Sequence, residues 1–451
     1  MIKFHSTNHS TPDVNFKTAV LKGQALDKGL YMLNQIPKIN QEVIFNFKDL
    51  NLQEIAFQVL KIILDQQIPE KDLKKIIKNA LNFEIGLEKI TQNDYLCHLT
   101  KGPTCSFKDF GARILARLME YFLSIDKKNI IILTATSGDT GGAVAQAMYS
   151  MSRIKVIILY PKNEVSDLQR KQMTTLGKNV IAIGINGKFD DCQKLVKTAF
   201  ADEELEDYNL SSANSINIGR LLPQSIYYFW SYSRIVKTMD EKVIFSVPSG
   251  NFGNLTAGII AYKMGLPVER FVSAVNENDE FPKFLESGSY HSIVPSRNCL
   301  SSAMNVGNPS NLARIFDLYG GQIDENGIII KNPALNDLRS IITSYSISDS
   351  LTKETIVDFY KQYNRIIEPH GAVGWAALQK YHKKNSHQTG IKSITFETAD
   401  PAKFPNEIIS LIKVEPKLPK SLENIQNKEE NPNPVEITKY EDFKSFVQNK
   451  M

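Results

Sequence analysis

The chain has 451 residues, of which 42% are hydrophobic and 23% charged, as expected for a globular protein of two or three lobes. The 53 basic and 49 acidic residues leave a net charge of only +4, and no basic block stands out, so nucleic-acid binding is not expected. The four cysteines lack CxxC spacing, and no apolar run approaches about 18 residues. We therefore expect no disulfide framework, no metal site, no signal peptide and no membrane span, and a cytoplasmic location.

Residues 1–90 are predicted to form a separate, mainly helical domain. The segments FKTAVLKGQALDKGLYML (16–33) and LQEIAFQVLKIILDQQI (52–68) carry apolar residues at helical spacing. Residues 91–415 are predicted to form a two-lobed region. The remainder, 416–451, is a C-terminal extension whose proline-rich, charged sequence predicts an extended surface segment before a last short helix.

The two-lobed region alternates apolar, β-branched strands with helical segments. This pattern predicts an α/β protein with mostly parallel sheets and helices on both faces. In such sheets, ligands bind beyond the carboxyl ends of the strands, so the strand-to-helix turns are the places to look for a site. The predicted strands are NIIILTAT (129–136), IKVIILYP (154–161), NVIAIGI (179–185), EKVIFSVP (241–248) and FVSAVN (271–276).

A single lysine lies at the mouth of a predicted helix. In GPTCSFKDFGAR (102–113), Lys108 stands where a polar segment gives way to ILARLMEYFL. The dipole at a helix N-terminus favours negative charge, so a lysine there is unusual. A solvated surface residue is the ordinary alternative.

The turn in SVPSGNFGNLTAG runs from a strand into a helix. Its residues Gly250, Asn251, Phe252, Gly253 and Asn254 offer backbone N–H groups and a helix N-terminus, which together suit a phosphate. The turn has neither the GxxxxGK[ST] nor the GxGxxG pattern. A tight turn capped by Asn254 is the alternative interpretation.

A second strand-to-helix turn, TATSGDTGGAVA, contains Ser137, Gly138, Asp139 and Thr140. Its hydroxyl groups and helix N-terminal amides suit a carboxylate. Asp139 would repel an anion bound nearby, so we expect its side chain to point elsewhere and to cap the helix.

A lysine, a phosphate turn without its own cation and a carboxylate turn are together what pyridoxal phosphate and an amino-acid substrate require. The motifs GPTCSFKDFGAR, LTATSGDTGGAVA, SANSINIGRLLPQ, SVPSGNFGNLTAG, EPHGAVGWAAL and TADPAKFP, taken in this order, resemble the threonine synthase family of the longer bacterial and fungal type. The resemblance spans essentially the whole chain. It implies a pyridoxal-phosphate-dependent lyase of the tryptophan synthase β fold, which is fold type II.

The resemblance also implies roles for individual residues. Lys108 would form the Schiff base with pyridoxal phosphate and then act as general base and acid, residues 250–254 would hold the cofactor phosphate, and Thr398 would meet the pyridine nitrogen. Residues 137–140 would hold the substrate carboxylate. The substrate would be O-phospho-L-homoserine, and the candidates for its phosphate are Arg113, Asn214, Asn217 and Arg220. Asp400 replaces the histidine that is usual in this family, which puts a direct substrate role for that position in doubt.

Three alternatives remain at this point. A serine/threonine dehydratase of the same fold is disfavoured by the long N-terminal domain and by SANSINIGR. A phosphohomoserine lyase would keep every phosphate contact and differ only in how water is admitted. A nucleotide-binding regulatory module would use the two glycine-rich turns without catalysis. The sequence predicts no oligomeric state.

Overall fold

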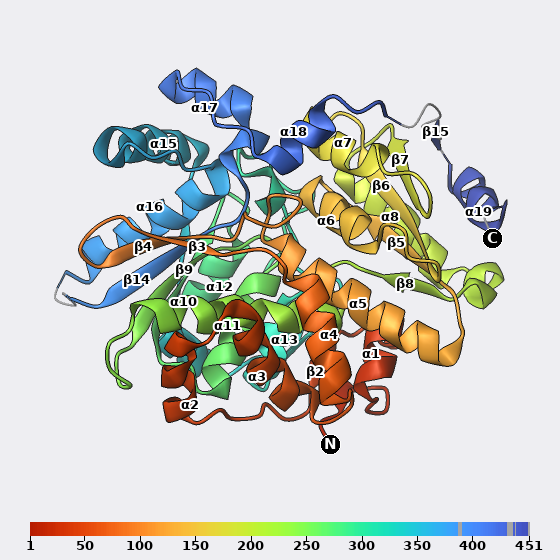
Figure 1. Ribbon diagram of the computed structural model, residues 1–451, viewed down its shortest axis with the longest axis horizontal. Helices are drawn as coiled ribbons and strands as arrows, with labels where there is room; N and C mark the ends of the chain where they lie inside the picture. The colour runs from red at the N-terminus through yellow and green to blue at the C-terminus, as the bar shows by residue number, and fades with distance from the viewer. Residues whose placement is uncertain (387–389, 431–435, 438, 450–451) are drawn as a thin grey trace.

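The computed structural model describes residues 1–451 except 387–389, 431–435, 438 and 450–451. Two separate sheets organise the chain, and Figure 1 shows them in the left and right halves of the molecule. The first has the order β13 (Ile342–Ser346), β10 (Val268–Val275), β9 (Val243–Pro248), β14 (Lys392–Glu397), β4 (Asp94–His98) and β3 (Gly86–Lys89). The second has the order β15 (Glu436–Ile437), β7 (Val180–Ile185), β6 (Ile154–Pro161), β5 (Ile130–Ala135) and β8 (Leu210–Ser212).

Strand pairing in these two sheets is parallel except between β3 and β4. Every residue of β5 and β9 is buried, which explains their continuous apolar runs, since a strand covered on both faces has no solvated side. The five strands expected from the sequence are β5, β6, β7, β9 and β10. The predicted class, α/β with mostly parallel sheets, is confirmed.

Helices cover both faces of each sheet. On the second sheet, α8 (Phe189–Ala201) packs with β5 and β6 in one apolar cluster, while α6 (Asp139–Met148) packs against β6 on the other face. On the first sheet, α16 (Pro369–Lys384) packs against β9, β10 and β14. The other helices of this region are α5 (Lys108–Asp126), α7 (Asp167–Thr174), α9 (Ile218–Leu221), α10 (Ser225–Ile235), α11 (Gly253–Met264), α12 (Glu280–Ser287), α13 (Leu312–Leu318), α14 (Leu335–Ile341), α15 (Asp349–Tyr363) and α17 (Pro405–Ile412). A small antiparallel pair, β11 (Gln322–Ile323) and β12 (Ile329–Lys331), follows α13.

The N-terminal region is mostly helical but begins with a small antiparallel pair. The helix expected over residues 16–33 ends early, because Gly23 adopts φ +75° and closes α1 (Phe16–Lys22). The expectation is wrong for residues 31–33, which form β2 (Tyr31–Leu33) and pair with β1 (Phe4–Ser6). The remaining elements are α2 (Gln41–Asn46), α3 (Leu52–Leu64) and α4 (Glu70–Ala80).

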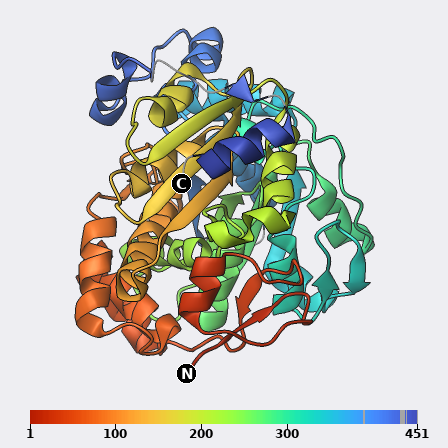
Figure 2. The ribbon, with the colours of Figure 1, turned by 90° about the vertical axis from the view of Figure 1, so that its right-hand side faces the viewer.

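The C-terminal extension is anchored at three points of the described chain. Helix α18 (Lys420–Gln426) contacts α7, β15 adds a strand to the second sheet, and α19 (Tyr440–Asn449) contacts α8. Leu422, Phe443 and Val447 are buried there. Figure 2 shows α19 lying across the strands of that sheet. The expected last helix is present, but the segment before it includes a helix and a strand. Parts of the extension, 431–435, 438 and 450–451, lie outside the described residues.

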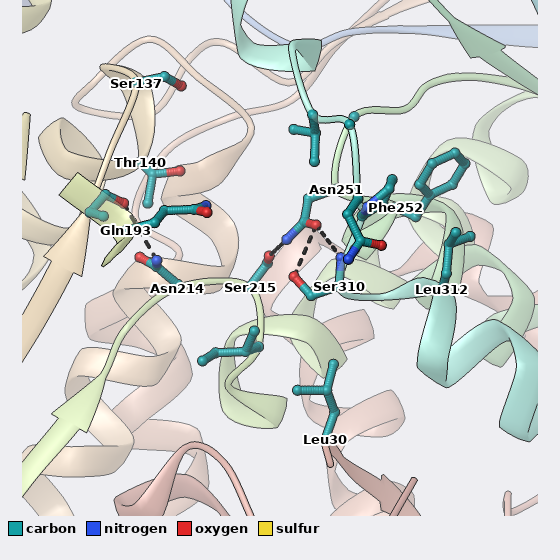
Figure 3. A pocket seen from close by; sticks show the side chains of 18 of the residues that line it. Leu30, Ser137, Thr140, Gln193, Asn214, Ser215, Asn251, Phe252, Ser310 and Leu312 are labelled. Atoms are coloured by element: carbon teal, nitrogen blue, oxygen red, sulfur yellow. Dashed lines mark hydrogen bonds between the residues drawn. The ribbon is translucent and has the colours of Figure 1, made fainter. Parts of the chain in front are cut away.

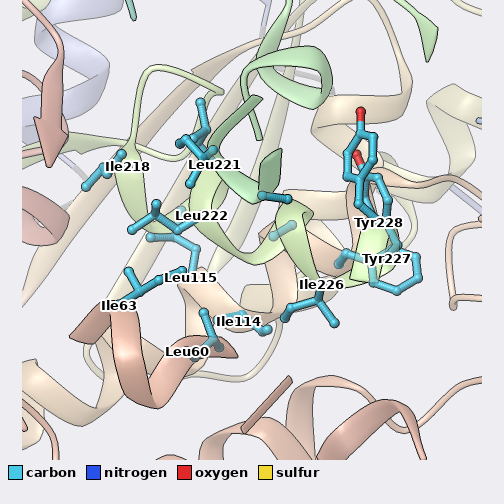
Figure 4. Packing of buried hydrophobic residues seen from close by; sticks show 14 of the residues in the cluster. Leu60, Ile63, Ile114, Leu115, Ile218, Leu221, Leu222, Ile226, Tyr227 and Tyr228 are labelled. Carbon is cyan, nitrogen blue, oxygen red and sulfur yellow. The ribbon is translucent and has the colours of Figure 1, made fainter. Parts of the chain in front are cut away.

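One apolar core runs from the N-terminal region into both lobes. Leu60 and Ile63 of α3 are buried in the same cluster as Leu115 of α5 and Leu222, which follows α9 (Figure 4). The division into 1–90, 91–415 and 416–451 therefore stays a prediction, because the packing does not separate the first two units. Within the described residues, no helix is long and apolar enough to cross a membrane.

The shared core predicts a large difference between two leucine truncations. Leu115 of α5 is fully buried in the apolar cluster that α5 shares with the N-terminal helices, whereas Leu26 is 81% exposed. Leu115→Ala should lower the free energy of unfolding by about 2–5 kcal/mol because it leaves a cavity. Leu26→Ala should change it by less than about 0.5 kcal/mol. Urea unfolding of both variants measures the difference, and equal midpoints would contradict the shared core.

Candidate active site

A cavity of 720 Å³ is lined by residues of the turns that follow β5, β8, β9 and β14. In Figure 3, Ser137 and Thr140 lie on one side of it, and Asn251 and Phe252 on the other. Parallel strands of one sheet end at a common edge, and the cavity is lined by turns from such an edge of each of the two sheets. The site residues expected from the sequence that line the cavity are Lys108, Ser137, Asp139, Thr140, Asn214, Arg220, Gly250, Asn251, Phe252, Gly253, Asn254 and Thr398.

Lys108 is the first residue of α5, and its side chain is only 14% exposed. The segment before it is tied to the C-terminal end of β14, because the backbone N–H of Phe107 donates to the Thr398 carbonyl at 2.9 Å. Burial lowers the pKa of Lys108 to about 8, although the carboxylate of Asp139 opposes this shift. The amine is therefore partly neutral near neutral pH, as a nucleophile or general base requires.

Asp139 lies beside Lys108, with its Oδ2 3.8 Å from the lysine Nζ. Its Oδ1 accepts hydrogen bonds from Lys403 Nζ at 2.7 Å and Gln169 Nε2 at 3.0 Å. Burial alone would raise the pKa of Asp139, but the ammonium groups of Lys403 and Lys108 hold it below its usual range. The expected helix cap by Asp139 is wrong, because these partners hold the carboxylate, and the side chain makes no capping hydrogen bond at α6.

The turn over residues 250–254 has the donor set that a phosphate requires. Within the described chain, no hydrogen bond engages the backbone N–H groups of these five residues, and α11 starts at Gly253. Phe252, at φ +59°, precedes the helix and turns the chain. Free N–H groups at a helix N-terminus bind anions, so the turn fits the phosphate of pyridoxal phosphate.

The side chains of this turn serve the loop itself. Asn254 Nδ2 donates to the Pro248 carbonyl at 2.6 Å, and its Oδ1 accepts the N–H of Leu255, in the first turn of α11, at 2.9 Å. Asn251 joins two neighbouring loops, donating to Ser215 Oγ at 2.6 Å and accepting from the Ser310 N–H at 2.7 Å (Figure 3). A Cβ at Gly250 would lie 2.8 Å from the Met304 Cα, so this glycine allows two loops to approach each other closely.

The turn after β5 is held by Thr136, whose Oγ1 accepts the N–H groups of Gly138 at 3.0 Å and Gly141 at 2.8 Å. The hydroxyl-bearing residues Ser137 and Thr140 line the cavity, as a carboxylate site requires. Gly138 adopts φ +129° and does not itself line the cavity.

The four candidates for the substrate phosphate separate into two pairs. Asn214 and Arg220 line the cavity, and no ion pair with a described carboxylate engages Arg220. Arg113 and Asn217 do not line it. Arg113 donates to the Ala80 carbonyl at 2.6 Å and braces the end of α4, while Asn217 caps α9. The sequence could not separate the pairs, since all four lie in or near helices close to the site.

Asp400 also serves local structure. Its carboxylate accepts the N–H of Ala402 at 3.0 Å and caps a short 3₁₀ turn over Pro401–Lys403, and it does not line the cavity. That turn positions Lys403, which lies in TADPAKFP but was not predicted to be a site residue.

His370 was not predicted to be a site residue either. It lines the cavity, and its Nδ1 lies 2.5 Å from Glu368 Oε2, while its Nε2 accepts the Ala303 N–H at 3.1 Å.

Taken together, the two-lobed parallel fold, the partly neutral buried lysine and the turns with free N–H and hydroxyl groups fit a pyridoxal-phosphate enzyme of fold type II. The family model described as "Pyridoxal-phosphate dependent enzyme" matches residues 95–395, and models for the N terminus and C-terminal part of threonine synthase match residues 3–81 and 371–447. The chain belongs to the threonine synthase family.

Relatives and solved structures agree with this assignment. Threonine synthase from Haemophilus influenzae is 40% identical over 94% of each chain. The crystal structure of pyridoxal-phosphate-bound threonine synthase from Brucella melitensis has a TM-score of 0.90 and 32% identity, and covers 100% of this chain and 99% of its own. That of yeast threonine synthase has a TM-score of 0.89 and 31% identity over 100% and 99%. The dehydratase and regulatory-module alternatives are thereby set aside.

The carboxylate turn predicts a contrast between two glycines. Gly138 has φ +129° and Gly177 has φ +68°, so a side chain added at either position would strain the backbone. A Cβ at Gly138 would also lie 2.6 Å from Gln169, whereas a Cβ at Gly177 would have no atom within 4 Å. Gly177→Ala should cost about 1 kcal/mol of unfolding free energy, and Gly138→Ala about 1–3 kcal/mol more. Gly138→Ala should also weaken pyridoxal-phosphate binding, because Gln169 holds Asp139. Equal effects in thermal unfolding and cofactor titration would contradict the contact.

Proposed function

We propose that this member of the family converts O-phospho-L-homoserine and water to L-threonine and inorganic phosphate. The observation that supports this most is that one cavity is lined by Lys108, the 250–254 turn and Arg220. The guanidinium of Arg220 forms no ion pair with a described carboxylate. A phosphorylated amino acid bound beside pyridoxal phosphate needs two phosphate sites and one amine, and the cavity offers these groups. The four cysteines are free and buried, which supports a cytoplasmic location, because thiols persist in reducing compartments.

The residues that would hold pyridoxal phosphate come from three turns. Lys108 would bind its aldehyde, the N–H groups of residues 250–254 its phosphate, and the Thr398 hydroxyl its ring nitrogen. A neutral hydroxyl does not enforce a protonated ring nitrogen as a carboxylate would. When bound, the cofactor supplies an electron sink for the bonds at the substrate Cα.

The substrate would lie between the second turn and Arg220. The hydroxyls of Ser137 and Thr140 bind its carboxylate, and the guanidinium of Arg220 binds its phosphate, since a planar fork of N–H groups matches phosphate oxygens. Arg220 Nη1 already donates to the Ala213 carbonyl at 2.6 Å, which fixes the orientation of the fork. Asn214 Oδ1 is buried without a hydrogen-bond partner, so it is available to accept from the ligand.

The amine of Lys108 carries the proton transfers. In its neutral form it would accept the proton from Cα, give that proton up and, neutral again, accept one from Cβ, whose electron pair expels phosphate from Cγ. The same amine, protonated by this second step, would return its proton to Cγ; water then adds its hydroxyl at Cβ, and a proton is restored to Cα. One base serves every step because the four-carbon stem of lysine reaches neighbouring carbon atoms. Lys403 and Gln169 hold Asp139 so that it stays ionised beside this amine.

An end-point assay tests the reaction itself. Purified protein with pyridoxal phosphate and O-phospho-L-homoserine should release phosphate and threonine in equal amounts. Phosphate accompanied by 2-oxobutanoate would instead identify a lyase that lacks the final hydration. No phosphate from a protein that binds the cofactor would reject the proposed substrate.

The proposed phosphate site is tested by the same substitution at Arg220, which lines the cavity, and at Arg113, which does not. Arg220→Lys should raise KM for O-phospho-L-homoserine at least tenfold, because a point charge replaces the bidentate fork. Arg113→Lys should leave KM within about twofold and lower thermal stability, since Arg113 binds backbone carbonyls away from the cavity. The reverse pattern in steady-state kinetics would move the phosphate site to Arg113.

The protonation state of Lys108 gives a pH test without turnover. The neutral amine is the form that captures pyridoxal phosphate, so uptake by the apoenzyme should rise with pH through about 8. The charged groups that act on Lys108 are Asp139, Arg220, Lys403 and Glu368.

Two variants should move this midpoint in opposite directions. Lys403→Met removes a cation and should shift it to higher pH, whereas Asp139→Asn removes the anion and should shift it lower. Lys101→Met, at an exposed lysine, should leave it unchanged. Absorbance of the bound cofactor follows the uptake, and identical midpoints in all four proteins would contradict the assigned electrostatics.

A further inference from the structure

Two histidines and an aspartate converge outside the cluster around Lys108. His5 lies on β1, His9 follows the next turn, and Asp317 lies on α13. His5 Nε2 is 2.9 Å and His9 Nε2 is 3.1 Å from the same oxygen, Asp317 Oδ1. Three groups that can each offer one ligand atom are thus gathered within 4.8 Å of one another.

The backbone brings the two imidazoles together. The N–H of His9 donates to the Ser6 carbonyl at 2.9 Å, which closes a tight turn, and His9 adopts φ +55°, uncommon for a residue with a side chain. The ring of His9 stacks on that of His5, with centroids 5.1 Å apart and planes 14° from parallel. Asp317 is 8% exposed, His5 18% and His9 51%, so the group is preformed but open to solvent on one side.

These distances and atom types suit a zinc-class cation. Zinc binds imidazole nitrogen and carboxylate oxygen at about 2.0–2.2 Å, and tetrahedral geometry then separates ligand atoms by roughly 3.3 Å. The observed separations of 2.9 and 3.1 Å need only a small expansion to admit the ion. Three protein ligands and one water, supplied from the open side, complete a tetrahedral set. No metal site was expected from the spacing of the cysteines; the pattern in the sequence that points to this one is the His-x₃-His pair of His5 and His9.

We propose that His5, His9 and Asp317 bind one divalent cation of the zinc class. The site adjoins the wall of the cavity. Thr7 and Asn8, which lie between the two histidines, line the cavity, and so do Leu312 and Ala313 at the start of α13. A metal ion would therefore fasten the N-terminal segment to α13 at the cavity wall. It would do so without touching the groups that carry out the reaction.

The test is calorimetric titration of the tag-free holoenzyme with zinc chloride, using three variants. His9→Gln and Asp317→Asn each remove one ligand, and His9 is half-exposed, so its substitution does not threaten folding. His382→Gln is the matched control, since His382 Nε2 also pairs with a carboxylate, Asp94 Oδ1, at 3.0 Å but without a second imidazole.

The wild-type protein and His382→Gln should bind one zinc ion per chain with equal affinity, and His9→Gln and Asp317→Asn should bind it at least tenfold more weakly. Zinc should raise the thermal unfolding temperature of the first two proteins only. Absence of saturable binding in the wild type, or equal affinity in all four proteins, would overturn the proposal. Zinc held by the cofactor alone would appear as equal affinity in all four.

Discussion

The burial of one cation, the ammonium of Lys108, is the constraint on which the site depends. A cation at a helix N-terminus, removed from water, is unfavourable both for solvation and for its interaction with the dipole. The structure offsets this with the carboxylate of Asp139 and lets the pKa of the amine fall to about 8. The same unfavourable environment that makes Lys108 costly to bury makes its neutral form accessible, and that form is the one the chemistry uses.

The N-terminal region is part of the architecture of the site. Arg314 is fully buried, and its guanidinium donates to the carbonyl groups of Tyr31 on β2 and of Ser215 and Ile216 beside the cavity. A buried arginine satisfied by carbonyl groups joins segments that no apolar contact would orient as specifically. These hydrogen bonds thus fix three segments relative to one another: the N-terminal pair β1–β2, α13 and the loop after β8.

Local patterns allowed the strands, the two anion-binding turns and Lys108 to be predicted, because each depends on residues adjacent in sequence. What the sequence could not give are pairings across the chain. Asp139 and Lys403 are 264 positions apart, so only the fold reveals that the aspartate is held by a buried lysine and does not cap its helix. Arg113 and Asn217 show the reverse case. Their residue types suit phosphate, but their side chains serve backbone groups that sequence patterns leave invisible.

The balance of buried charge bears on the phosphorylated substrate that we propose. Lys108, Lys403 and Arg220 lie near one another, whereas Asp139 is the only described carboxylate in an ion pair with any of them. Burial raises the pKa of the next carboxyl, Asp109, to about 6, so at neutral pH it is still mostly ionised and offsets part of this positive charge. Burial lowers the pKa of Arg220 to about 10, although the carboxylate of Asp109 opposes this shift, so keeping this guanidinium charged in the cavity wall has a desolvation cost. An anion bound beside Arg220 would relieve this cost and a neutral amino acid of the same shape would not, which supports the phosphorylated substrate that we propose.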